Sequence, residues 1–274
     1  MKSKIIILVV LAVCVVAACL CIGNKNNSNT VHVNGVNLSV QSAGSGQPII
    51  LIHGLGYSKE SMYPLVQHLQ PNYRVVSYDV RGHGQSDKPE SFTLDDHADD
   101  LYALIHKYKL KKPIVIGFSM GSYIALKTAE KYPDIFDKIV LIGTKGGGTT
   151  SSSQQYASNA GSIMNRVFAP TTSQEAIASY AKNSTSSVQL SDSQRNAIYK
   201  SLTNFDLLND VGRVNTPVLL LTGEYDGLNP PAAAMRVADA LPNAEFYIVP
   251  NAGHIAFFEN PDFVYERIDE FLKQ

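Results

Sequence analysis

Short, continuous runs of apolar residues recur along the chain and predict buried β-strands. Continuous runs, rather than alternating ones, are typical of parallel strands, because helices cover such a sheet on both faces. The runs are Pro48–Ile52, Tyr73–Tyr78, Pro113–Ile116, Lys138–Ile142, Val218–Leu221 and Glu245–Val249.

The gaps between these runs carry apolar residues at helical spacing, and a hairpin pattern precedes the first run. Two alternating segments, Thr30–Val33 and Val36–Val40, flank Asn34-Gly35, a pair that favours a tight β-turn. The alternation of strand and helix predicts an α/β fold, a mostly parallel, doubly wound sheet that opens with an antiparallel hairpin. The expected helices are Leu94–Tyr108, Tyr123–Lys131, Ala232–Leu241 and Phe257–Leu272.

The stretch from Thr144 to Thr203 interrupts the alternation of predicted strands and helices. Of its 60 residues, 20 are Ser or Thr and seven are charged. Its apolar residues still recur at helical spacing, and Thr172-Ser-Gln-Glu175 has the spacing of a capping box, in which side chains satisfy the first N–H groups of a helix. Long structureless loops are uncommon inside compact domains, so we expect a small helical cap inserted at about residues 144–212. The alternative is a low-complexity loop without a role.

The N-terminal segment has the pattern of a targeting or membrane-anchoring sequence. Ile5–Ile22 is a run of 18 apolar residues behind Lys2 and Lys4, and residues 24–30 form a polar tether before the domain at residues 31–274. The run is long enough for a membrane-spanning helix. It also contains Val16-Ala-Ala-Cys19, which resembles the lipobox of prokaryotic lipoproteins and makes Cys19 a candidate for lipidation. An uncleaved anchor, a lipoprotein and plain secretion after signal cleavage all place the domain outside the cytoplasm.

Composition excludes several classes of function. The net charge is −1 without a basic block, so nucleic acid is not an expected partner. All three cysteines, at positions 14, 19 and 21, lie in the N-terminal run, which leaves no thiol nucleophile, disulfide framework or cysteine metal site in the domain. No cofactor or metal is implied.

The clearest chemical motif is Gly117-Phe118-Ser119-Met120-Gly121, a G-x-S-x-G pentapeptide between a predicted strand and a predicted helix. A nucleophilic serine needs this setting, because it stands on a tight turn from which flanking glycines remove clashing side chains. The N-terminus of the helix also favours developing negative charge. Ser119 is therefore the candidate nucleophile.

A serine hydroxyl needs a base, and that base needs an acid to orient it. His254, in Asn251-Ala-Gly-His254, follows the last predicted strand and is the expected base. Asp226 follows the strand Val218–Leu221 and is the expected acid, at the sheet edge where ligands of α/β proteins bind. Glu224 is its rival, but Gly227 and Pro230 indicate that the chain turns beside Asp226.

Catalysis at a carbonyl group also needs N–H donors for the oxyanion. The predicted strand Pro48–Ile52 runs into His53-Gly54-Leu55-Gly56, a glycine-rich turn. We expect the backbone N–H groups of Leu55 and Met120 to form the oxyanion hole. His53 is expected to brace this turn rather than act as a base.

The chain order Ser119, Asp226, His254, with an upstream His-Gly turn, resembles the α/β-hydrolase superfamily. A second likeness is Asp79-Val-Arg-Gly-His-Gly-Gln-Ser86, which matches the D-x-R-G-x-G-x-S loop of that superfamily, where it is mainly structural, so Arg81 and His83 receive no catalytic role. The resemblance extends over about residues 31–274. It implies the fold and the triad, but not the substrate.

Among small capped members, the chain resembles carboxylesterases, lactonases, C–C bond hydrolases and cofactor-free haloperoxidases. Haloalkane dehalogenases and epoxide hydrolases carry Asp where Ser119 stands, and proline iminopeptidases carry a tryptophan that this chain lacks. C–C hydrolases commonly read S-x-G-G where this chain has Ser119-Met-Gly-Ser122.

The resemblance therefore implies a serine hydrolase that cleaves carboxylic esters or lactones. A cofactor-free haloperoxidase or perhydrolase and a C–C bond hydrolase remain alternatives. A ligand receptor with little turnover is the alternative from another class.

Overall fold

The computed structural model describes residues 28–148, 166–184, 190–203 and 205–274. The N-terminal apolar run, Cys19 and most of the polar tether lie outside these residues. Within the described ranges, no helix has the length and apolar character needed to cross a membrane.

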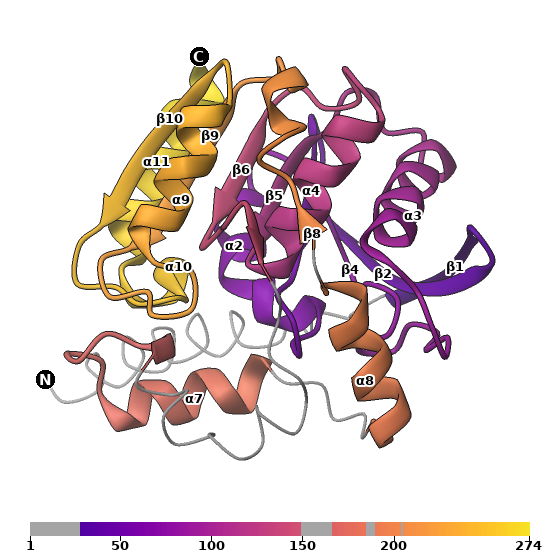
Figure 1. Ribbon diagram of the computed structural model, residues 1–274, viewed down its shortest axis with the longest axis horizontal. Helices are drawn as coiled ribbons and strands as arrows, with labels where there is room; N and C mark the ends of the chain where they lie inside the picture. The colour runs from indigo at the N-terminus through magenta and orange to yellow at the C-terminus, as the bar shows by residue number, and fades with distance from the viewer. Residues whose placement is uncertain (1–27, 149–165, 185–189, 204) are drawn as a thin grey trace, which may run out of the picture.

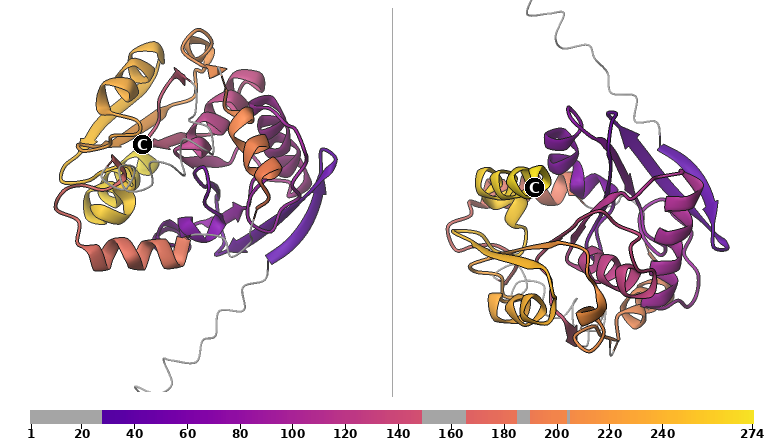
Figure 2. Two further views of the ribbon diagram at one scale, coloured as in Figure 1. Left: turned by 60° about the horizontal axis from the view of Figure 1, so that its bottom comes forward. Right: turned by 90° about the horizontal axis from the view of Figure 1, so that it is seen from above.

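Eight strands form the central sheet in the spatial order β1-β2-β4-β3-β5-β6-β9-β10. β1 and β2 are antiparallel, β2 is antiparallel to β4, and all other pairs are parallel. The predicted α/β architecture is confirmed, and Figure 2 shows the hairpin at one end of the sheet and β9 and β10 at the other. The strands are β1 Ser28–Val33, β2 Val36–Ala43, β3 Pro48–Ile52, β4 Arg74–Tyr78, β5 Ile114–Phe118, β6 Ile139–Ile142, β9 Val218–Gly223 and β10 Ala244–Val249.

The hairpin forms where the sequence predicts it. Asn34 and Gly35 adopt φ angles of 44° and 74°, and Val33 pairs with Val36. This left-handed geometry matches the twist of an antiparallel ribbon, and Asn-Gly adopts it at low cost.

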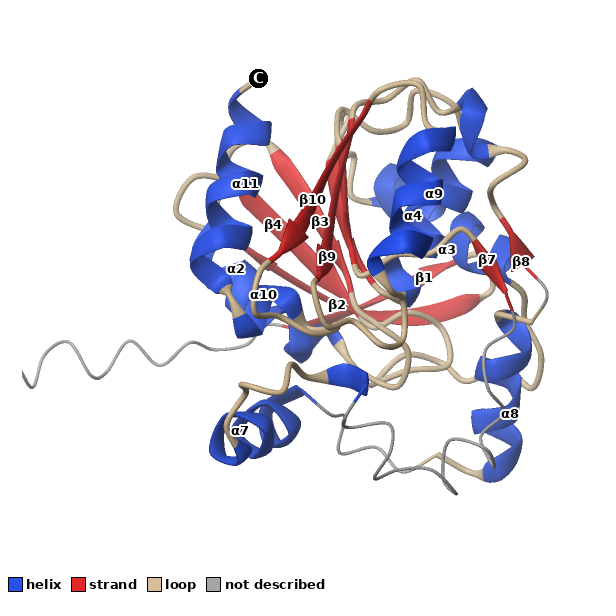
Figure 3. Ribbon diagram, turned by 60° about the vertical axis from the view of Figure 1, so that its left-hand side comes forward, coloured by secondary structure: helices blue, strands red, loops and turns tan. Residues whose placement is uncertain are grey.

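Helices cover both faces of the sheet (Figure 3). α3, α4 and α9 pack on one face, and α2 and α11 pack on the other. Successive residues of one strand alternate between the two cores, so that Ile50 and Ile52 face α3 and α4 while Ile49 and Leu51 face α2 and α11. The helices are η1 Lys59–Met62, α2 Tyr63–Leu69, α3 Leu94–Lys107, α4 Met120–Lys131, η2 Val211–Arg213, α9 Pro231–Ala240, α10 Ala256–Glu259 and α11 Pro261–Lys273.

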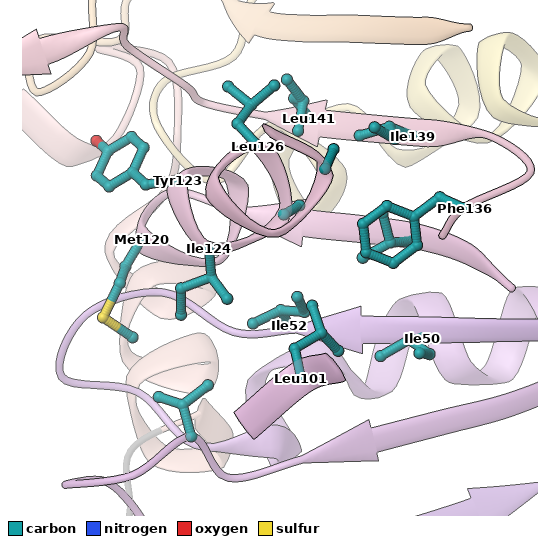
Figure 4. Close-up of a cluster of buried hydrophobic side chains, with 14 of the residues drawn as sticks. Ile50, Ile52, Leu101, Met120, Tyr123, Ile124, Leu126, Phe136, Ile139 and Leu141 are labelled. Carbon is teal, nitrogen blue, oxygen red and sulfur yellow. The ribbon is translucent and has the colours of Figure 1, made fainter. Parts of the chain in front are cut away.

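The first core is continuous from the sheet into α4. Ile50 and Ile52 of β3, Ile124 of α4 and Leu101 of α3 interdigitate in it, and each is fully buried (Figure 4). This packing fixes α4, and with it the turn that carries the candidate nucleophile, against the middle of the sheet.

The chain leaves the sheet after β6 and returns to it at β9. In between, α7 (Gln174–Ser184) and α8 (Asp192–Ser201) lie beyond the carboxyl ends of the parallel strands (Figures 1 and 3). Two short strands, β7 (Gly147–Gly148) and β8 (Phe205–Asp206), pair at the base of this excursion. Residues 149–165, where part of the helical spacing was expected, lie outside the described ranges.

Two local predictions are wrong. The expected continuous helix Phe257–Leu272 breaks at Asn260, because Pro261 cannot supply a helical N–H and disfavours a helical conformation in the residue before it. The capping box at Thr172 does not form. Ser173 caps α7 by accepting a hydrogen bond from the Ala176 N–H, while the Thr172 hydroxyl donates to Glu259.

Candidate active site

Ser119 stands on a strained turn between β5 and α4. Its φ and ψ are 51° and −114°, a region that residues with a side chain rarely occupy. The Ser119 N–H donates to the carbonyl of Ile142 on β6 at 2.8 Å, which ties the turn to the next strand. The side chain is half-buried, as a nucleophile that must meet a substrate requires.

The glycine-rich turn after β3 approaches Ser119 closely. A Cβ built on Gly54 would lie 3.3 Å from the Ser119 Cβ and 3.0 Å from the Phe118 ring. A side chain at position 54 would therefore crowd Ser119. The close approach places this turn, which continues to Leu55, beside the residue that precedes α4.

His254 and Asp226 form a buried pair. The His254 Nδ1 and the Asp226 Oδ2 lie 2.8 Å apart, and the two residues are 3% and 2% exposed. A carboxylate can only accept, so Nδ1 carries the proton and Nε2 is left to accept one. The His254 ring also packs on Phe118, the residue before Ser119, with ring centroids 5.1 Å apart.

The backbone holds Asp226 in its orientation. Its Oδ1 accepts hydrogen bonds from the N–H groups of Leu228 and Asn229 at 2.9 and 2.8 Å, so the chain turns here as expected. Glu224 is exposed and accepts a hydrogen bond from the Asn251 N–H at 3.1 Å. The structure therefore pairs His254 with Asp226 rather than with Glu224.

The loop that carries His254 is fixed by the inserted segment. The His254 N–H donates to the carbonyl of Val167 at 2.6 Å. Glu259 links the same two segments. Its carboxylate accepts hydrogen bonds from the Gly253 N–H at 2.9 Å and from the Ala169 N–H at 2.7 Å. Placement of His254 thus depends on contacts with residues 167–169.

The expected oxyanion donors lie on the two turns that meet at Ser119. Met120 is the first residue of α4, so its N–H has no acceptor within the helix. Leu55 follows Gly54 in the turn after β3. His53 braces this turn, since its Nδ1 donates to the Gly54 carbonyl at 2.8 Å and its Nε2 accepts from the Val80 N–H at 3.1 Å. Burial lowers the pKa of His53 and keeps the ring neutral.

The segment Asp79–Ser86 makes structural contacts inside the domain. Arg81 forms two hydrogen bonds with Asp100 of α3, at 2.6 and 2.5 Å, and both residues are buried. His83 donates to the Arg81 carbonyl at 3.2 Å, and burial together with nearby His53 lowers the pKa of His83 to about 3. Arg81 and His83 are thus buried and hydrogen-bonded within the domain, in keeping with the structural role expected of this segment.

Two residues near the site escaped the sequence analysis. The Asn229 side chain donates to the Tyr123 phenol at 2.7 Å and to the Gly143 carbonyl at 2.6 Å. The only sequence signals are the position of Tyr123, four residues after Ser119 on one helix, and that of Asn229, three residues after Asp226. Neither spacing is specific enough to have identified the contact.

Comparison with known proteins decides the family. The family model described as the alpha/beta hydrolase fold matches residues 47–195 and 151–261, which together span most of the chain. The chain belongs to the α/β-hydrolase family.

Relatives of this α/β hydrolase differ in the reactions that their names state. A 2-(acetamidomethylene)succinate hydrolase from Mesorhizobium japonicum is 27% identical over 263 residues, covering 89% of this chain and 95% of the relative. An esterase from Exiguobacterium antarcticum superposes with a TM-score of 0.81 at 21% identity, covering 90% and 100% of the two chains. An enol-lactonase from Burkholderia xenovorans superposes with a TM-score of 0.80 at 22% identity, with the same coverage. At these identities the two structures show the fold alone.

Within the described part of this α/β hydrolase, no group of three or more His, Cys, Asp and Glu side chains is arranged to hold a metal ion.

Proposed function

We propose that this α/β hydrolase cleaves carboxylic esters or lactones through a covalent acyl-enzyme on Ser119. The observation that carries the proposal is the buried 2.8 Å contact between His254 Nδ1 and Asp226 Oδ2 beside the strained Ser119 turn. It fixes the tautomer in which Nε2 can take the proton of the nucleophile.

In the proposed reaction, Ser119 Oγ attacks the carbonyl carbon and its proton passes to His254 Nε2. The oxyanion accepts hydrogen bonds from the N–H groups of Leu55 and Met120. When the tetrahedral intermediate collapses, the bond to the leaving oxygen breaks and His254 protonates that oxygen. Water then attacks the acyl-enzyme, gives its proton to His254 and releases the acid, and Ser119 Oγ recovers the proton.

The test is labelling of the protein with a fluorophosphonate, followed by assays with p-nitrophenyl esters of increasing chain length and with lactones. Stoichiometric labelling that Ser119→Ala abolishes, together with ester turnover, is the expected result. Full labelling of Ser119→Ala would place the nucleophile elsewhere. Labelling at Ser119 without turnover of any ester or lactone would favour another hydrolase reaction or a receptor role.

We also propose that residues 1–23 hold the domain at a membrane, outside the cytoplasm. The support is the sequence: 18 apolar residues behind two lysines, with Cys19 in a lipobox-like context. A transmembrane helix or a multiply acylated lipoprotein would each anchor stably. β1 begins at Ser28, so a chain that lacks residues 1–27 keeps the whole hairpin.

Fractionation of the native host separates the possible modes. Lipidation predicts that Cys19→Ser blocks processing and leaves a precursor 18 residues longer than the mature form. A helix anchor predicts no change with Cys19→Ser. The full-length gene could instead yield a soluble protein whose N-terminus is cut at a site other than after Ala18. That result would contradict both anchors and support plain secretion.

A further inference from the structure

Residues 166–169 of the inserted segment contact both the acid loop (residues 224–230) and the base loop (residues 250–255). On the acid side, the Gly227 N–H donates to the Arg166 carbonyl at 2.9 Å. The Arg166 guanidinium donates in turn to the Gly227 carbonyl, from Nε at 3.0 Å and from Nη2 at 2.6 Å. A Cβ built on Gly227 would lie 3.0 Å from the Arg166 Cβ. The residue directly after the acid is thus held closely against the inserted segment.

Glu259 makes the corresponding connection on the base side. It is the last residue of α10, which lies between β10 and α7 (Figures 1 and 3). Its Oε2 accepts from the Gly253 N–H at 2.9 Å. Its Oε1 accepts from the Ala169 N–H at 2.7 Å and from the Thr172 hydroxyl at 2.6 Å. One carboxylate thus joins the residue before His254 to two residues of the inserted segment.

The backbones of the base loop and the inserted segment touch at Gly253. A Cβ at this position would lie 2.4 Å from the Val167 carbonyl oxygen and 2.8 Å from the Ala169 nitrogen. His254, the next residue, donates its own N–H to the Val167 carbonyl at 2.6 Å. The base therefore follows a backbone contact that admits no side chain.

The acid and base loops also bond to each other directly. The Tyr225 N–H donates to the Ala252 carbonyl at 2.9 Å, just before the acid in one loop and just before the base in the other. Residues 166–169 add a second connection, through Gly227 after the acid and through the backbone of the base itself. Fixing both loops matters, because a misplacement of about 1 Å at a reacting pair can lower a rate about a hundredfold.

We propose that Arg166 and Glu259 are positioning residues through which the inserted segment keeps the acid and the base of the triad in hydrogen-bonding geometry. The geometry in question is the 2.8 Å contact between Asp226 Oδ2 and His254 Nδ1. The role rests on the acyl-enzyme chemistry proposed for Ser119, which uses this pair. The inserted segment then supports the chemical step itself, in addition to any contact that it makes with a substrate.

The first measurement is the rate of labelling by a small fluorophosphonate, which needs an activated Ser119 but few contacts with a binding pocket. Arg166→Ala removes two hydrogen bonds to the acid loop and should slow labelling about three- to tenfold. Glu259→Gln keeps the size of the side chain but turns an NH2 group toward the N–H of either Gly253 or Ala169, and should slow labelling about tenfold. The end point should remain one label per chain.

Arg195→Ala and Glu224→Gln are the matched controls. Arg195 lies in α8 of the same inserted segment, is exposed like Arg166 and also donates to a backbone carbonyl, but that carbonyl belongs to Leu190 of the segment itself. Glu224, like Glu259, accepts from a backbone N–H of the base loop, but it extends from the acid loop and not toward residues 166–169. Both control variants should be labelled at the rate of the natural protein.

Proton NMR distinguishes positioning from general stability. The Nδ1 proton of His254, held against the buried Asp226 carboxylate, should resonate far downfield of the amide protons. We expect this resonance to shift upfield or broaden in Arg166→Ala and Glu259→Gln, and to stay unchanged in Arg195→Ala. A variant that is merely less stable keeps the resonance in its folded molecules. Slower labelling with an unchanged resonance would overturn the proposal.

Asp226→Asn provides a background in which the contact with the base is already disturbed. If Arg166 acts through the acid, Arg166→Ala should slow labelling no further in that background, and multiplicative losses would contradict the role. A lower end point for Arg166→Ala would indicate partial unfolding. Arg166→Lys, which can still donate to the Gly227 carbonyl, then carries the test and should react at a rate between those of Arg166→Ala and the natural protein.

Ser119→Ala, measured in parallel, separates the two proposals. If Ser119→Ala is unlabelled while Arg166→Ala and Glu259→Gln react at the rate of the natural protein, the positioning role fails and the nucleophile assignment stands. If Ser119→Ala is labelled, the proposed function fails.

Discussion

Gly121 packs its backbone directly against the carbonyl group of Ile52. A Cβ built on Gly121 would lie 2.2 Å from the Ile52 oxygen, well inside van der Waals contact. The second glycine of the G-x-S-x-G motif therefore lets α4 approach β3, and the turn with Leu55 begins directly after β3. The contact sets the spacing between the turn with Ser119, the proposed nucleophile, and the turn with Leu55, a proposed oxyanion donor.

Gly121→Ala should therefore destabilise the protein, although alanine is the better helix former. The clash is with backbone that cannot rotate away, and overpacking of this kind costs about 1–3 kcal/mol or more. Gly212→Ala is the control, since a Cβ there would lie 3.6 Å from its nearest neighbour and should change the free energy of unfolding by less than about 0.5 kcal/mol. Urea unfolding of both variants makes the comparison. Equal stabilities would show that α4 and β3 can separate without penalty.

Ser119→Gly should be more stable than Ser119→Ala. The backbone at position 119 is strained for any residue with a Cβ, at a cost of about 1–3 kcal/mol, and glycine alone removes that strain. Glycine also makes the unfolded chain more flexible, which offsets up to about 1 kcal/mol of the gain. Thermal unfolding of the two inactive variants measures the difference. A less stable glycine variant would mean that the turn is relaxed rather than strained.

Asp226→Asn should reduce ester hydrolysis by several orders of magnitude, whereas Glu224→Gln should have little effect. The Asp226 carboxylate orients His254 from a buried position, and an amide there can favour the wrong tautomer. Glu224 is exposed, and among the described residues its side chain bonds only to the backbone N–H of Asn251. The ratio of the two kcat/KM values decides the assignment, and a larger loss at Glu224 would reverse it.

Three buried histidines should make the fold sensitive to mild acid. Burial lowers the pKa of His53, His83 and His97 below the ordinary value of 6.5, and that of His83 to about 3. The unfolded chain therefore binds more protons than the folded protein below about pH 6.5, and stability falls as the pH falls. Each histidine contributes up to about 1.4 kcal/mol per pH unit in this window.

Urea unfolding between pH 7 and pH 4.5 measures this slope. His83→Asn removes one of the three titrating groups and keeps a donor near the Arg81 carbonyl, so the slope should decrease by about one histidine's share. A free energy of unfolding that is constant across this range would show that these rings do not stay neutral in the folded protein.

Much of the sheet could be predicted because its strands are buried on both faces. Runs such as Pro48–Ile52 were located correctly, since a continuous apolar run of that length fits few other structures. The expected acid and base were located by the same logic. Asp226 and His254 follow β9 and β10, neighbouring parallel strands whose carboxyl ends lie side by side.

Contacts set by packing in three dimensions could not be predicted in this way. Asn229 and Tyr123 are 106 residues apart, and no local pattern indicates that their side chains meet. Ser173, rather than the predicted Thr172, caps α7. The Thr172 hydroxyl instead donates a hydrogen bond to Glu259, which is 87 residues away. In both cases a distant polar partner decided which of several plausible local arrangements forms.

The position of the inserted segment has an evolutionary consequence. The sheet and the three loops with Ser119, Asp226 and His254 come from sequence outside the excursion between β6 and β9. Descendants of such a gene can therefore exchange that segment and acquire new substrates while they inherit the same chemistry. The freedom has one limit: the hydrogen bond from His254 to Val167 and the bonds of Glu259 to Ala169 and Thr172 must be rebuilt with each exchange. Innovation should consequently concentrate in residues beyond this junction, and the junction itself should change slowly.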